Sequence, residues 1–106
     1  MIVVLFRSRL SDQADEEYDL TEERLAKKVR ALAGPDLVDV KNYRSDDGER
    51  LAVVWWRDAE TLAKWRDDPE HQAAQQLGRD RWYSFYELSV AEVIRTSSST
   101  STTSTD

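Results

Sequence analysis

The amino-acid sequence predicts an α+β fold of the ferredoxin-like class, with the element order β-α-β-β-α-β. In this fold a four-stranded antiparallel sheet carries two helices on one face. Three observations predict it. Strand-like apolar segments begin the chain and close its folded part, two amphipathic helical patterns lie between them, and an Asp-Asp-Gly turn at residues 46–48 joins two further strands.

The composition limits the chain to one domain and to a narrow set of partners. Its 106 residues include 15 basic and 21 acidic side chains, a formal charge of −6. This charge argues against nucleic acid and against an anionic membrane as partners. The chain has no cysteine and one histidine, so it offers neither a Cys-ligated nor a multi-histidine metal site. No stretch approaches the ~20 apolar residues of a membrane span, and the first residues are typical of a strand rather than a signal peptide. We expect a soluble, cytoplasmic protein.

The N-terminal third predicts one strand and one helix. Residues 1–9 are rich in β-branched side chains and apolar on both faces over their first half. A helix then follows, with Ser11 or Asp12 as its cap, and Gly34 and Pro35 end it. Its apolar stripe, at three- and four-residue steps, consists of Ala14, Tyr18, Leu25, Val29 and Leu32, with Thr21 filling it.

The middle of the chain predicts a hairpin of strands 37–45 and 51–56. The second of these, LAVVWW, is apolar at every position, whereas a hairpin strand with one wet face alternates. Both of its faces should therefore be covered. Trp55 and Trp56 point to opposite faces, one toward the helices and one away from them.

The C-terminal third predicts a broken helix and a long last strand. Asp58 caps the helix, Asp68 and Pro69 break and restart it, and Gly78 ends it. The strand covers residues 81–94.

The end of the chain has two further features, an irregular strand and a polar tail. The alternation in the last strand loses its phase near Leu88 and Ser89, which predicts an irregularity there. Residues 96–106 are Ser and Thr with one terminal acid, so we expect a disordered tail after a domain of residues 1–95.

Two helices cover only one face of such a sheet. The other face keeps apolar side chains from residues 51–56 and from the outer strands, a larger patch than monomers usually expose. The simplest way to cover it is to pack two sheets back to back, so we expect a two-fold homodimer.

A set of residues near the second helix, and the spacing between them, resembles a known protein family. The residues that carry the resemblance are Trp65, Pro69, Glu70, His71, Ala74, Gly78, Trp82 and Tyr83. With the strand order, they make residues 1–95 resemble the antibiotic biosynthesis monooxygenase family of dimeric α+β barrels. The resemblance implies a pocket between sheet and helices, beside the second helix. The family resembled includes cofactor-independent monooxygenases that oxidise polycyclic aromatics to quinones, haem-degrading enzymes and members without known activity.

His71 and Trp65 are the candidate catalytic residues. His71 lies in the first turn of the restarted helix, where exposed backbone N–H groups favour a neutral imidazole that can accept a proton from a phenol. The alternative is that His71 caps the helix break or lies on the surface. Trp65 is a core residue or an aromatic platform. Six residues separate the two, so a straight helix would place them roughly 120° apart, and the break could rotate them together.

The candidate substrate-binding residues are Phe6, Asn42, Trp82 and Tyr86. Trp82 and Tyr86 lie on one face of the last strand and could form a flat aromatic slot, although core or dimer contacts suit them equally. Asn42 and Arg7 are polar residues on otherwise apolar strands and could bind substrate oxygens, unless they lie in water near strand ends.

The sequence predicts no metal and no organic cofactor. A haem-degrading member of the family resembled would need an axial histidine about ten residues beyond the helix tryptophan and an asparagine in the first strand; Gln75 and the Phe6–Arg7 pair occupy those regions. The sequence contains no phosphate-binding glycine motif, so it gives no support for a flavin or nicotinamide cofactor.

The predicted function is a homodimeric, cofactor-independent monooxygenase that uses O2 on a hydrophobic aromatic, polyketide-like substrate. The alternatives are a non-catalytic dimeric ligand-binding module and, less favoured, a haem-binding or haem-degrading monooxygenase.

Overall fold

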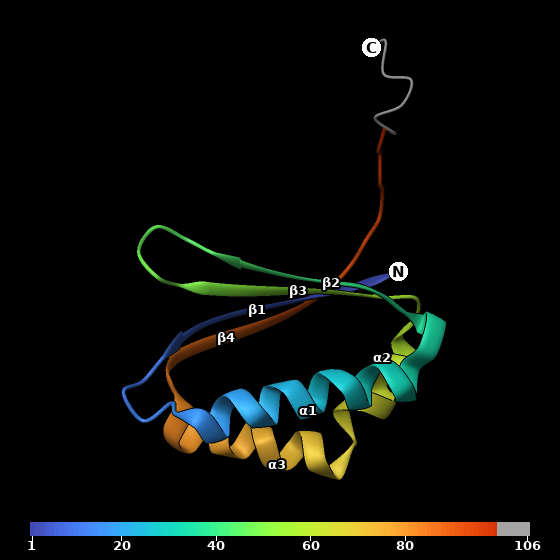
Figure 1. The fold of residues 1–106 in the computed structure, drawn as a ribbon. Helices are drawn as coiled ribbons and strands as arrows, with labels where there is room; N and C mark the ends of the chain where they lie inside the picture. Colours follow the sequence, from blue (N-terminus) through green and yellow to red (C-terminus); the bar gives the residue numbers. More distant parts are fainter. Residues whose placement is uncertain (100–106) are drawn as a thin grey trace.

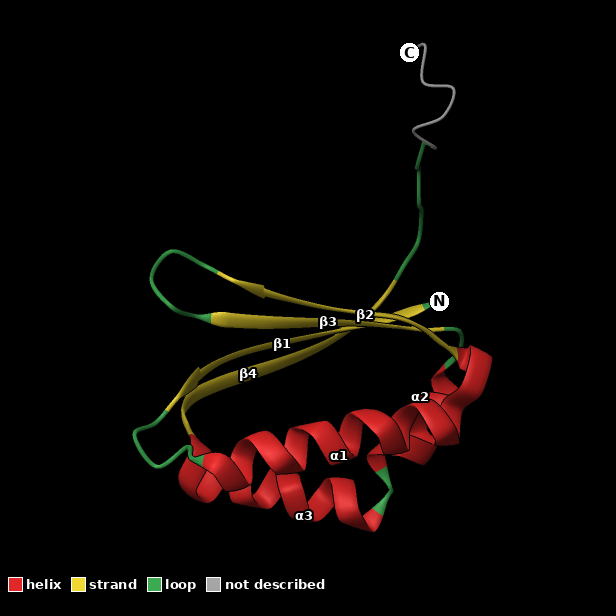
Figure 2. Cartoon of the chain, viewed as in Figure 1, coloured by secondary structure: helices red, strands yellow, loops and turns green. Residues whose placement is uncertain are grey.

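The computed structural model describes residues 1–99 and confirms the ferredoxin-like α+β fold. One four-stranded antiparallel sheet has the strand order β2-β3-β1-β4, and the helices lie together on one of its faces (Figure 1). The strands are β1 (Ile2–Leu10), β2 (Leu37–Arg44), β3 (Arg50–Trp56) and β4 (Tyr83–Glu92). The helices are α1 (Glu16–Ala33), α2 (Ala59–Arg66) and α3 (Pro69–Leu77), with a 3-10 turn η1 (Gly34–Asp36) and a π-helical turn η2 (Gly78–Trp82) (Figure 2).

The predicted tail falls partly outside the described residues. Residues 96–99 have no helix or strand, and residues 100–106 lie outside the described part of the chain.

Helix α1 begins later than predicted. Its cap is Asp15, whose carboxylate accepts the backbone N–H of Glu17 at 3.1 Å, so the prediction of Ser11 or Asp12 is wrong. Ser11 instead donates its hydroxyl to the carbonyl of Arg81 and ties the end of β1 to η2. The helix ends as predicted at Gly34, whose φ of +55° is one that residues with a Cβ rarely adopt.

The core lies where α1 and α2 pack on β1 and β3. Its buried apolar side chains are Val4, Leu25, Ala33, Trp56 and Trp65. The predicted stripe of α1 is confirmed at Tyr18, Thr21 and Leu25 but not at Leu32, which is 39% exposed. Ala33 takes its place because it follows Leu25 and Val29 at steps of four residues, which keep to one helix face.

The predicted break between α2 and α3 is confirmed. Asp58 caps α2 by accepting the N–H of Thr61 at 2.8 Å, and Asp68 caps α3 by accepting the N–H of His71 at 3.0 Å. Pro69 occupies the first position of α3, where its missing N–H costs nothing. The break redirects the chain, so α3 runs beside α1 (Figure 1).

Helix α3 ends at Leu77 with Gly78 as its C-cap, as predicted, but the chain does not become extended at Gly78. Its φ of −58° and ψ of −50° are helical, and the chain continues as η2 to Trp82. Arg81 and Trp82 therefore precede the last strand rather than begin it. A glycine is favoured at position 78 for a steric reason: a Cβ there would lie 2.6 Å from Cε2 of the Tyr83 ring, so the ring would have to move.

Two bulges set which side chains face the helices. In β4, Tyr83 pairs with Leu10 and Phe85 with Arg9, so Ser84 is the extra residue. The predicted irregularity near Leu88 and Ser89 is wrong, because both pair in unbroken register with β1.

In β2 the extra residue is Val38. Leu37 pairs with Trp56 and Asp39 with Trp55, which places Leu37 on the helix face and not with Asp39 as the alternation predicts. Trp56, 2% exposed, faces the helices, and Trp55 faces away from them.

Candidate active site

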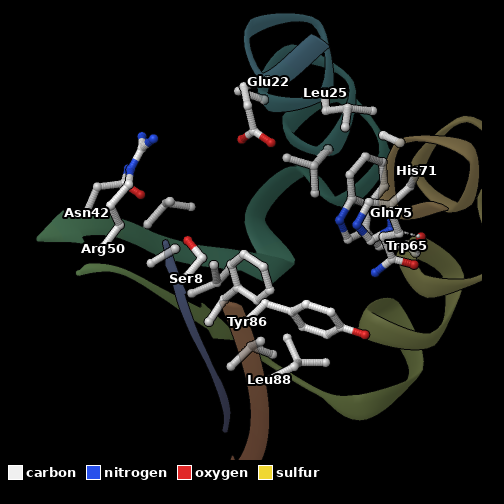
Figure 3. A pocket seen from close by; sticks show the side chains of 18 of the residues that line it. Ser8, Glu22, Leu25, Asn42, Arg50, Trp65, His71, Gln75, Tyr86 and Leu88 are labelled. Carbon is white, nitrogen blue, oxygen red and sulfur yellow. Dashed lines mark hydrogen bonds between the residues drawn. The ribbon is translucent and has the colours of Figure 1, made fainter. Parts of the chain in front are cut away.

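A cavity of about 430 Å³ opens between the sheet and the helices (Figure 3). Side chains of all four strands and of α1, α2 and α3 line it. Its wall is mostly apolar, with Val4, Leu25, Val29 and Leu62 among the aliphatic side chains. Such a volume and lining are typical of sites for small organic ligands.

His71 and Trp65 meet at the wall of this cavity. Their rings stack with centroids 4.2 Å apart and an interplanar angle of 15°. The break before Pro69 produces this geometry, because a straight helix would separate the two residues by roughly 120°. Trp65 was predicted to be either a core residue or an aromatic platform of the site. Its side chain is 9% exposed and part of the core, and it also lines the cavity.

The imidazole of His71 has a defined tautomer. Its Nδ1 lies 2.9 Å from the carbonyl oxygen of Trp65. A carbonyl only accepts, so Nδ1 carries the proton and Nε2 keeps its lone pair. Burial lowers the pKa of His71, and the Trp65 carbonyl and the Asp68 carboxylate partly oppose that shift. The ring is neutral near pH 7, as predicted, but burial is the main cause rather than the helix terminus.

Three of the four predicted substrate-binding residues line the cavity. Phe6, Asn42 and Tyr86 contribute to its wall from β1, β2 and β4. Trp82 does not: it is 1% exposed, and its ring packs edge-on against Tyr18 at 5.3 Å between centroids. The bulge at Ser84 and the helical turn η2 take Trp82 out of the strand face that Tyr86 occupies.

Arg7 lies on the opposite face of the sheet, so it does not join the cavity. Its guanidinium binds Glu49 at 2.9 Å and Glu87 at 3.3 Å and lies over the ring of Phe85. The Arg7 side chain is thus part of a surface ion-pair network.

Sequence reasoning missed the most polar part of the cavity. Tyr18, Glu22, Arg50 and Tyr83 line it, and none was a candidate. Glu22 lies outside the apolar stripe of the α1 sequence, and Arg50 follows a turn, so neither stands out in the sequence. Two of these residues carry a signal in the sequence: Tyr18 belongs to the apolar stripe of α1, and Tyr83 belongs to the residues that resemble the family.

The pKa values of these groups reflect their shared surroundings. Burial raises the pKa of Tyr83 and of Tyr18. Desolvation by the cavity wall also raises the pKa of Glu22, and Arg50 opposes that shift, although the side chain remains open to solvent through the cavity mouth. Arg50 opposes the shift at all three groups, which places its charge among them.

Within residues 1–99, His, Asp and Glu side chains do not gather in groups of three that could hold a metal ion. None of the helices described is both long and apolar enough to cross a membrane.

The chain is similar to the members of one protein family and to two individual proteins. The family model for antibiotic biosynthesis monooxygenases matches residues 1–77. The uncharacterized protein YqjZ of Bacillus subtilis is 36% identical over 92 residues, which are 87% of this chain and 78% of YqjZ. The jasmonate monooxygenase ABM of Pyricularia oryzae is 33% identical over 101 residues, or 88% of this chain, but the match spans only 43% of that longer protein.

The fold comparison agrees. The crystal structure of SnoaB, a cofactor-independent oxygenase from Streptomyces nogalater, superposes with a TM-score of 0.68 and 16% identity. The superposition covers 90% of this chain and 94% of SnoaB. At this identity the likeness concerns the fold alone.

Proposed function

Because the chain belongs to the antibiotic biosynthesis monooxygenase family, we propose that it is a cofactor-independent monooxygenase. Its substrate is a hydrophobic aromatic molecule that binds in the cavity between the sheet and the helices and reacts there with O2. The observation that carries the proposal is the stacked pair of His71 and Trp65 at the cavity wall.

In this proposal His71 is the general base. The bond from Nδ1–H to the Trp65 carbonyl holds the ring and leaves Nε2 to accept the proton of a phenol or enol. Trp65, Phe6 and Tyr86 confine the substrate rings, and Asn42 offers an amide to a substrate oxygen.

The reaction balances without a further reductant. The substrate loses a proton to Nε2, and the electron-rich anion donates electrons to O2 and forms a hydroperoxide at the activated ring carbon. The O–O bond then breaks: one oxygen atom stays on the substrate as a carbonyl and the other leaves as water. For an anthrone this consumes one O2 and yields the quinone and one water.

We further propose that the protein works as a homodimer. The sheet face away from the helices carries half-buried Val3, Leu5 and Trp55, which a second copy would cover.

Oxygen uptake with anthrone tests the activity. We expect the purified protein to consume one O2 per quinone formed. His71→Asn is the informative variant, because its amide can still donate to the Trp65 carbonyl but cannot act as a base. It should keep the wild-type circular dichroism spectrum and lose roughly 10²-fold or more in kcat.

One observation favours the alternative of a non-catalytic ligand-binding module. The same bond between His71 and Trp65 bridges the junction of α2 and α3, so it also suits a purely structural histidine. Saturable anthrone binding without oxygen uptake would support this alternative and contradict the monooxygenase proposal.

A further inference from the structure

A second polar group lines the cavity, on different elements from His71 and Trp65. The carboxylate of Glu22 projects into it from α1, and Arg50 lies at the start of β3 across the cavity (Figure 3). The guanidinium carbon of Arg50 is 5.7 Å from the centroid of the Tyr18 ring, so the aromatic face holds the arginine within the wall.

The charge of the lining is opposite in sign to that of the chain. Among residues 1–99, Arg30, Arg50 and Arg79 line the cavity, and Glu22 is the one acidic residue in its wall. With His71 neutral, these side chains carry a formal charge of +2, whereas the whole chain carries −6. Charges of one sign that line a low-dielectric cleft concentrate ions of the other sign there.

Arg50 differs from Arg7 and Arg9, the two arginines of β1 at this end of the sheet. Arg7 binds Glu49 at 2.9 Å, and Arg9 binds Asp47 at 2.6 Å. Arg50 is half-buried and forms no ion pair with any of residues 1–99. A guanidinium stays charged at any physiological pH and presents five donors, a fork that matches a carboxylate. Its donors therefore remain available to a ligand in the cavity.

We propose that the substrate is a lipophilic carboxylic acid whose carboxylate binds Arg50 while its ring system lies against Trp65 and His71. The inference rests on the proposed function, because it names the substrate class of the same cavity. Glu22 limits the affinity, since its negative charge faces the same space. The arginine fixes which end of the molecule is presented to His71, and so selects the ring carbon that is oxidised.

A pair of matched aromatic probes tests this directly. Anthracene-2-carboxylate and its uncharged carboxamide have the same rings and nearly the same shape. We expect isothermal titration calorimetry at pH 7.5 and constant ionic strength to give one site per chain, with the carboxylate bound about tenfold more tightly or better.

Two variants with opposite expected effects on carboxylate binding distinguish a loss of ligand recognition from a loss of the fold. Arg50→Gln should abolish the preference for the carboxylate and leave carboxamide binding unchanged. Glu22→Gln should strengthen carboxylate binding several-fold, which a damaged fold cannot do. Arg44→Gln is the control for Arg50, because it pairs with Arg50 across β2 and β3 but does not line the cavity. Glu23→Gln is the control for Glu22.

The outcomes distinguish this inference from the proposed function. Equal affinities for the two probes, unaltered by Arg50→Gln, would overturn the carboxylate inference and leave the aromatic cavity standing. Failure of both probes to bind would overturn the proposed function as well, because a site for aromatic substrates must take one of them.

Discussion

The His71 imidazole shows how one side chain depends on its neighbours. Stacking on Trp65 and the bond to the Trp65 carbonyl fix its plane and tautomer, and its burial favours the uncharged form. The lone pair of Nε2 is then available without any change of protonation at neutral pH.

The single histidine makes the pKa directly measurable. In the folded protein we expect the NMR titration of the His71 ring to give a pKa below the ordinary value of 6.5, and in urea a return to about 6.5. Because the unfolded state then binds the proton more strongly, the contribution of His71 to stability is full above pH 6.5 and decreases as pH falls through the folded pKa. A folded pKa above 6.5 would contradict the assigned burial, and His71→Asn should lack this pH dependence.

Gly78 is a second position where one atom matters. In a helical conformation, Gly→Ala ordinarily stabilises by about 1 kcal/mol. Here the added Cβ would lie 2.6 Å from the Tyr83 ring, which Phe6, Tyr18 and Tyr86 surround. We expect Gly78→Ala to lower the free energy of unfolding by about 1–3 kcal/mol, as measured by urea denaturation.

The control for this position is the same change in a Tyr83→Leu background. Without the ring, Gly78→Ala should be neutral or stabilising. An equal loss of stability in both backgrounds would show that contact with Tyr83 is not the cause.

At the scale of elements, the junction of α2 and α3 builds the site. Asp68 accepts the backbone N–H of His71 at 3.0 Å and binds Lys28 of α1 at 3.1 Å. Lys28 also binds Glu70 at 3.0 Å, so the start of α3 is tied to α1 by charge. This junction directs α3 back along α1 and turns His71 toward Trp65.

Asp68→Ala should therefore weaken both the helix start and the site. We expect the melting temperature to fall by about 4–8 °C, because the cap and the tie to α1 are lost together. Asp67→Ala is the matched control: Asp67 caps the end of α2 through its backbone N–H, which alanine keeps, and its side chain is 72% exposed, so the melting temperature should stay near that of the wild type. Equal effects of the two variants would contradict the capping role.

At the scale of the whole molecule, the helices leave one face of the sheet uncovered (Figure 1). On that face the side chains of Leu5 and Trp55 are half-buried in the single chain. Val53 of β3, which is flanked by β1 and β2, is 8% exposed. The opposite face holds the cavity, so assembly through the uncovered face would leave the site intact.

Sedimentation at micromolar concentration should give twice the chain mass. Leu5→Lys places a charge in the middle of the uncovered face and should shift the protein toward the monomer, because desolvating an unpaired charge is costly. Leu32→Lys is the control, since Leu32 is 39% exposed on α1. A folded wild-type monomer at this concentration would contradict the proposed dimer.

Local patterns in the sequence determined the element order and most of the fold. The apolar periodicity, the caps at Asp58 and Asp68, and the stop at Gly34 act within a few residues of one another, so they can be read along the chain. The break at Pro69 is also local, but it left the relative direction of His71 and Trp65 open, and the neutral state of His71 depends mainly on burial in the folded chain.

Only the tertiary structure decided which side chains share the cavity. The bulges at Val38 and Ser84 depend on how neighbouring strands pair, and they change which residues face the helices. The helical continuation through Gly78 buries Trp82 away from the cavity, against the prediction from strand alternation. Arg50 and Glu22 are 28 positions apart in the sequence. They line the same cavity because β3 and α1 pack on opposite sides of it, and a contact made by such packing leaves no local pattern in the sequence.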